Sequence, residues 1–122
     1  MTSREQMQSL TAYIRALWKH DFADEPVEMH YEVLPDRAVP RIVEIFADGR
    51  AEADTLESHA RRYPLFQGIS LIDGDMPTAA ELRATTAAES PGEFEIFEST
   101  QIEFEVAFRS ATPLMNPEDE NQ

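Results

Sequence analysis

The sequence predicts an α+β domain in which two or more helices pack on one side of a small antiparallel sheet of about four strands, connected as hairpins or a meander. Short β-rich runs separated by turn residues fill the first half of the chain, and a capped helix-forming segment follows Pro77. The length of 122 residues fits one domain. We place it at residues 12–111, between a flexible N-terminus (1–11) and an acidic flexible tail (112–122).

Four segments show the pattern of strands. Residues 13–20 and 29–34 alternate in polarity and predict two strands, of which the second is the more exposed. Residues 41–46 and 50–54 flank a turn that carries Asp48-Gly49 and predict a hairpin. Because residues 41–46 are apolar on both faces over part of their length, we expect this strand to be central in the sheet.

Helical signals follow the expected hairpin. Thr78 and Glu81 form a capping box that predicts a helix over about residues 79–88. Residues 55–76 predict only a short helix or a loop, with an apolar patch towards their end. Residues 100–108 fit two structures: alternating apolar residues favour a strand, whereas Thr100 with Glu103 three positions later favours a helix.

The charge of the chain limits its partners. Asp and Glu number 24 against 10 Lys and Arg, which gives a formal net charge of −14. Such a field repels nucleic-acid phosphates and anionic lipids, so we expect no direct nucleic-acid binding and no membrane binding. It attracts a basic protein partner, or it only keeps a small protein soluble. The chain is expected to be a monomer or a homodimer.

Composition also bears on the compartment. The chain has no cysteine, which excludes disulfides and thiolate metal sites and fits a reducing cytoplasm. No apolar run reaches the roughly 20 residues that span a bilayer, and the start MTSREQMQSL lacks the regions of a signal peptide. We therefore expect a cytoplasmic protein, and we expect no cofactor and no bound metal.

His20 is the first candidate for chemistry. It follows Trp18 at the end of the first strand, and Asp21, Asp24 and Glu25 lie within five positions. One interpretation is an acid–base pair or a hard-metal site, with His20, Asp24 and Glu25 as the weak catalytic candidates. The other is a buried structural histidine beside the indole, hydrogen-bonded to a nearby carboxylate. The sequence contains no phosphate loop, nucleophile elbow or paired-histidine motif. It therefore favours a protein without enzymatic activity, although it does not decide the question.

Other charged residues offer binding groups. Arg50 is expected to pair with Glu44 or Glu52 across the hairpin, or to hold an anionic ligand together with Arg41. A locally basic spot followed by two aromatic residues could bind anions or anchor a helix end in the core; its residues are His59, Arg61, Arg62, Tyr63 and Phe66. The full set of expected binding residues is Trp18, His20, Asp21, Asp24, Glu25, Glu44 and Arg50.

Two acidic regions are expected to face a cationic partner. One is the bend over residues 21–28. The other is the aromatic stretch over residues 94–108 with the residue before it, and its acidic side chains are Glu93, Glu95, Glu98, Glu103 and Glu105. The alternative interpretation of each region is a solvated face that binds no partner.

Two motifs resemble those of a known family. The run WKHDFADEP at residues 18–26, followed by VEIFADGR at residues 43–50, resembles a family of small bacterial domains of unknown function with the pattern W-x-H-x-x-x-x-E-P and then V-E-I-F-x-D-G-R. TQIEFEVAF, over residues 100–108, is similar to the helical segment that closes those domains. The resemblance covers roughly residues 12–110. It implies a helix at the closing segment and an antiparallel sheet with helices to one side, and it brings no activity.

Three functional hypotheses follow. The first is a non-enzymatic acidic protein-binding module, such as an immunity-type or inhibitor protein that covers a basic surface of an effector. The second is a small enzyme or ligand-binding domain that uses His20 and a carboxylate in a pocket walled by Trp18 and Phe46. The third is a nucleic-acid mimic, which requires rows of carboxylates along one face.

Overall fold

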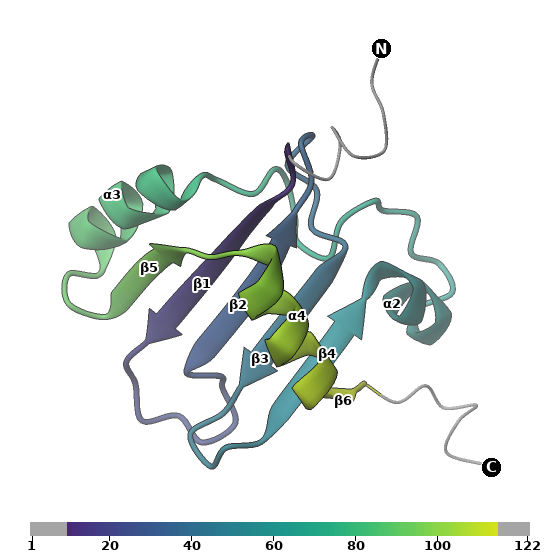
Figure 1. Cartoon of the computed structure of the whole chain (residues 1–122), viewed down its shortest axis with the longest axis horizontal. Coiled ribbons are helices and arrows are strands. Elements are labelled where there is room, and N and C mark those ends of the chain that lie inside the picture. The colour runs from purple at the N-terminus through teal and green to yellow at the C-terminus, as the bar shows by residue number, and fades with distance from the viewer. Residues whose placement is uncertain (1–9, 115–122) are drawn as a thin grey trace.

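The computed structural model describes residues 10–114, and Figure 1 shows them as one twisted sheet with helices on both of its faces. Within these residues the sheet has six strands in the order β5-β1-β2-β3-β4-β6. All pairs are antiparallel except β4 with β6. The strands are β1 Ala12–Trp18, β2 Glu28–Val33, β3 Arg41–Ile45, β4 Ala51–Thr55, β5 Phe94–Glu98 and β6 Thr112–Pro113. The helices are α2 Leu56–Arg62, α3 Ala79–Glu89 and α4 Gln101–Ser110.

The α+β class is confirmed, but the sheet has more strands than the four expected. The four N-terminal strands lie within a few residues of their predicted positions, and β3 is central as expected. β5 and β6 were not predicted. β5 is made of FEIFE and pairs with β1, so that Phe94 lies opposite Trp18. This strand depends on a distant partner, which local sequence does not reveal.

The core consists of two clusters on opposite faces of the sheet. Ile14 and Ala16 of β1 belong to one cluster, which Ala79 and Leu82 of α3 cover. The other cluster contains Val43, Ala53 and Phe104 together with further residues of α4. The expectation of helices on one side of the sheet is therefore wrong. The physical reason is that several strands carry apolar side chains on both faces, and each face needs its own cover.

The helix at the C-terminal end settles the ambiguity of residues 100–108. Thr100 caps α4 by accepting the N–H of Glu103, while the Glu103 carboxylate accepts the Ser99 hydroxyl at 2.7 Å. The four alternating apolar residues divide between two sides of the helix. Phe104 is 1% exposed, whereas Ile102 and Val106 are 77% and 62% exposed. In Figure 1, α4 crosses the sheet in front of its central strands.

The two other helices begin as their caps dictate. The capping box of Thr78 and Glu81 is present, so the predicted helix is confirmed as α3. Thr55 caps the short helix α2, which occupies the start of the segment that the sequence left open. No helix among the described residues is long and apolar enough to cross a membrane. The acidic end of the expected tail, at Glu118, Asp119 and Glu120, lies outside the described residues.

Candidate functional site

His20 organises the connection between β1 and β2. Its Nδ1 accepts the backbone N–H of Phe22 at 2.9 Å, and its Nε2 lies 2.8 Å from the carbonyl oxygen of Pro26. Because Nδ1 is the acceptor, Nε2 carries the proton and donates it to that oxygen. Both nitrogens are engaged with backbone atoms. The histidine is structural, but it is half-buried and its partners are backbone groups where the sequence led us to expect a carboxylate. This geometry leaves no nitrogen for a metal ion or a substrate.

Aromatic rings join this connection to the sheet edge. Trp18 stacks on Phe94 with ring centres 5.7 Å apart, and the His20 ring lies 4.1 Å from the indole. Phe22 stacks on His20 at 5.4 Å, yet it is 61% exposed. The other expected wall, Phe46, is buried, and the Arg50 guanidinium lies over its ring at 4.1 Å.

The residues that follow His20 form the acidic loop, which we define as residues 21–25. Asp21, Asp24 and Glu25 are exposed there beside Phe22. Among residues 10–114, none of these three carboxylates forms an ion pair with a basic side chain. The N–H of Glu25 donates to the carbonyl oxygen of Phe22 at 3.3 Å and closes the loop. This loop thus presents one aromatic ring and three carboxylates that have no basic partner in the described part of the chain.

The negative charge continues onto β3 and β4. Glu44 lies opposite Glu52 in the strand register. Burial, followed by the charges of Glu52, Glu25 and Asp54, raises the pKa of Glu44. Arg50 supplies one positive charge, with its Nε 3.7 Å from an oxygen of Glu52. Of the two pairings expected for Arg50, the structure has the one with Glu52.

Arg41 is not part of an anion site with Arg50. Its guanidinium binds Glu32 and Glu105, each at 2.6 Å, and lies over the Phe104 and Phe108 rings at 4.8 and 4.7 Å. The hydrogen bonding that Arg41 donates to Glu32 contributes most to raising the pKa of Arg41, so the guanidinium stays charged. These contacts fasten α4 to the sheet.

The basic spot at the end of α2 is also engaged internally. Arg61 pairs with Glu57 and Arg62 pairs with Asp54, at 2.7 and 2.6 Å. The His59 ring packs against Tyr63 and Phe66, with centres 4.7 and 4.6 Å apart. Tyr63 is 55% exposed, and neither it nor Phe66 belongs to the two core clusters, so the expected anchor in the core is wrong: the rings pack on His59 at the surface instead. With both arginines paired, the spot offers little to an anion.

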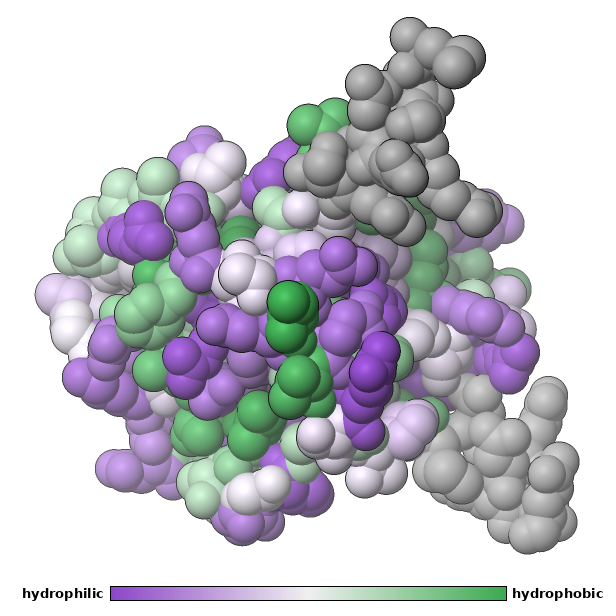
Figure 2. Space-filling model, viewed as in Figure 1, coloured by the Kyte–Doolittle hydropathy of each residue, from purple (hydrophilic) through white to green (hydrophobic). Residues whose placement is uncertain are grey.

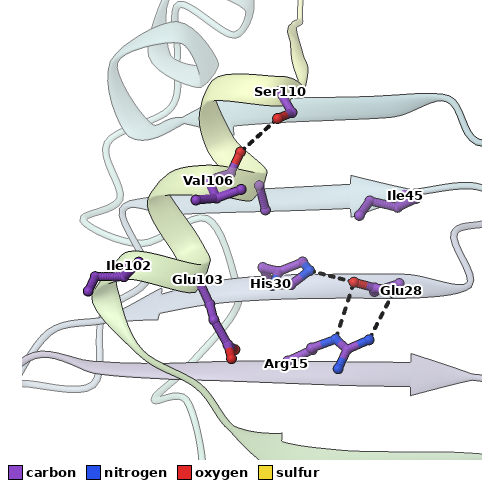
Figure 3. Close-up of a pocket in the computed structure, with 9 residues that line it drawn as sticks. Arg15, Glu28, His30, Ile45, Ile102, Glu103, Val106 and Ser110 are labelled. Carbon is purple, nitrogen blue, oxygen red and sulfur yellow. Dashed lines mark hydrogen bonds and ion pairs between the residues drawn. The ribbon is translucent and has the colours of Figure 1, made fainter.

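A second site, which the sequence did not indicate, lies between α4 and the sheet. Arg15, Glu28 and His30 line a hollow of about 380 Å³ together with apolar residues (Figure 3). The Nε2 of His30 lies 2.7 Å from a Glu28 oxygen, and Arg15 binds the same carboxylate at 3.2 Å. His30 is 5% exposed. We call this site the α4 hollow.

Only the fold brings these three residues together. Arg15 pairs with His30 across β1 and β2, and Glu28 lies two residues before His30 on the same face of its strand. In the sequence, Glu28 and His30 look like the solvent side of an alternating strand. The sequence would have indicated this site only if the register of β1 and β2, which places Arg15 opposite His30, had been predicted.

These observations define a small α+β domain with an acidic aromatic loop at one end of the sheet and a hollow under its C-terminal helix. The chain belongs to the family described as a domain of unknown function (DUF6881), whose model matches residues 12–113. No curated protein matches the chain, and no solved structure matches it.

Proposed function

We propose that the protein is a non-enzymatic protein-binding module that takes a basic segment of its partner on the acidic loop. The observation that carries the proposal is the exposed Phe22 ring beside three carboxylates that lack a basic partner within residues 10–114. A lysine or arginine is attracted to the face of an aromatic ring, and nearby carboxylates strengthen that attraction. The loop offers both groups to one cation.

The order of the loop supports a binding role. The two hydrogen bonds of His20 hold residues that are exposed at the surface. A loop that is already ordered loses less conformational entropy when a partner binds. The motif residues Trp18, His20 and Pro26 then serve to build the loop, while Phe22 and its acidic neighbours make the contact.

Repulsion among acidic groups favours a cationic partner over a second copy. The net charge is −14, and the raised pKa of Glu44 reflects burial among other carboxylates. A positive partner surface relieves this repulsion, whereas self-association increases it. We infer fast, salt-sensitive association with a basic protein.

Three finer points belong to the same proposal. The protein works in the bacterial cytoplasm, in keeping with a chain that has no cysteine. We propose further that the W-x-H-x-x-x-x-E-P and V-E-I-F-x-D-G-R motifs are shared by the family. In this chain, residues of the first motif build the acidic loop. The partner is an effector whose basic surface the module covers, in the manner of an immunity or inhibitor protein.

The test places a photo-reactive phenylalanine analogue at position 22 and, as a control, at position 87 on the exposed side of α3. A basic protein cross-linked at position 22 alone is then purified, and its affinity is measured by calorimetry at about 0.05 and 0.5 M salt. Affinity should fall steeply with salt and with the pair Asp21→Asn and Asp24→Asn. The control pair Asp73→Asn and Glu89→Gln removes the same charge elsewhere and should have a small effect. Equal cross-linking at both positions, or equal effects of the two pairs, contradicts the proposal.

A further inference from the structure

We propose that the α4 hollow receives an aromatic side chain bearing an O–H or N–H group, tyrosine or tryptophan, from the same partner, and that His30 Nδ1 accepts its hydrogen bond. This inference rests on the proposed function and names a second anchor for it. The carrying observation is that Nδ1 of His30 is buried and has no hydrogen-bond partner, and it is the one such side-chain atom found within residues 10–114. Buried polar atoms in folded proteins rarely stay unpaired.

We take the His30 imidazole as neutral, because it is buried and the Arg15 guanidinium that binds the same carboxylate disfavours a second positive charge. In this form Nδ1 is an acceptor. Burial by itself raises the pKa of Glu28, but the hydrogen bonds from Arg15 and His30 outweigh it, and the pKa lies below its ordinary value. Glu28 is therefore a carboxylate that accepts the Nε2 hydrogen of His30. A neutral imidazole that donates through Nε2 has a free lone pair on Nδ1. The missing group in the hollow is a donor.

The walls of the hollow specify the rest of the ligand. They are apolar along α4 and β3, where Ile45, Ile102, Val106 and Ala107 line the space. Figure 2 shows apolar residues gathered on this face of the molecule. Ile102 and Val106 extend the apolar wall to the surface, since both are largely exposed. An apolar ring with one polar hydrogen fits such a site, and tyrosine and tryptophan are the side chains that combine the two.

Charge separates this anchor from the acidic loop. Arg15 binds Glu28 within the hollow, and the other carboxylate of the lining, Glu103, accepts the Ser99 hydroxyl. The hollow thus attracts a cation less than the acidic loop, where three carboxylates lie beside an aromatic ring, so a lysine or arginine is directed to the loop and a neutral donor to the hollow. Nδ1 is shielded from solvent, so the proposal requires side chains at the mouth to move before the ring reaches this atom; exposed side chains change rotamer within nanoseconds.

The first experiment uses small probes and the purified protein. The affinities of p-cresol and toluene, which differ by one hydroxyl, are measured by NMR titration of backbone amides and the His30 ring. One hydrogen bond corresponds to about 3- to 10-fold tighter binding of p-cresol. In His30→Phe this preference should vanish, while in His59→Phe it should remain. Equal binding of the two probes, or a preference that survives in His30→Phe, overturns the inference.

The second experiment uses the cross-linked partner. His30→Phe and the surface change Val106→Ser should each weaken binding about tenfold, the scale of a strong interface residue. If Asp21→Asn with Asp24→Asn weakens binding while both of these variants bind normally, the hollow is not an anchor and the proposed function stands. If p-cresol binds through His30 but the affinity of the partner is unchanged in both variants, the hollow binds a small molecule and the inference is wrong.

Discussion

The Nδ1 atom of His20 accepts the backbone N–H of Phe22 at 2.9 Å, two residues further along the chain. With the contact of Nε2 to the Pro26 carbonyl oxygen, this ring ties the start of the acidic loop to its end. The side chain that the sequence offered as a catalytic base is thus used to shape the backbone around Phe22.

Removing this ring should loosen the loop. His20→Ala leaves the Phe22 N–H and the Pro26 carbonyl without their side-chain partner, and we expect a loss of about 1–3 kcal/mol in the free energy of unfolding. Hydrogen exchange should accelerate at the amides of Phe22 and Glu25. His59→Ala is the control, because it removes a histidine on α2. Unchanged exchange at Phe22 would show that the loop does not depend on His20.

Glu44 should make stability depend on pH. The pKa of Glu44 is raised in the folded protein. Ionisation of Glu44 therefore begins to oppose folding when the pH exceeds its pKa in the unfolded chain, and the effect is complete above its pKa in the folded chain. Glu44→Gln should therefore raise the free energy of unfolding at pH 7, and the gain should disappear below about pH 4, where folded and unfolded chains are both protonated. Urea titrations at several pH values measure it. Glu89→Gln should give no such pH-dependent gain.

The two sides of α4 should respond differently to truncation. Phe104 is 1% exposed and packs on Tyr13, with ring centres 5.5 Å apart, so Phe104→Ala should cost about 3–5 kcal/mol. Ile102 is 77% exposed, and Ile102→Ala should change stability by less than about 0.5 kcal/mol. Chemical denaturation of both variants measures the contrast. Equal losses would fit a strand, in which Ile102 and Phe104 lie on the same buried face, and would contradict the helix.

The contacts of Arg41 should matter more than a surface ion pair. Arg41→Met removes the bonds to Glu32 and Glu105 and leaves both carboxylates partly buried, at a cost of about 1–3 kcal/mol. Arg61→Met breaks the exposed pair with Glu57 and should cost below about 0.5 kcal/mol. Thermal unfolding compares the two. A similar small loss for both variants would mean that Arg41 does not fasten α4.

The resemblance to a family of domains of unknown function is confirmed by the match over residues 12–113. Local signals were enough for the four N-terminal strands and for the cap of α3. They located the acidic loop as well, because its carboxylates, Phe22 and His20 lie within six consecutive residues. They did not reveal that both nitrogens of His20 are used by backbone atoms.

Strand alternation, turn residues and helix caps act over a few positions, so the sequence by itself determined the class of fold, the acidity and the loop. The tertiary structure decided what depends on distant pairing. It placed FEIFE beside β1 as β5, put α3 and α4 on opposite faces, and divided the apolar residues of α4 between core and surface. It also aligned Arg15 with His30 and so created the α4 hollow. Strand register is set by burial across the whole sheet, and no local pattern contains it.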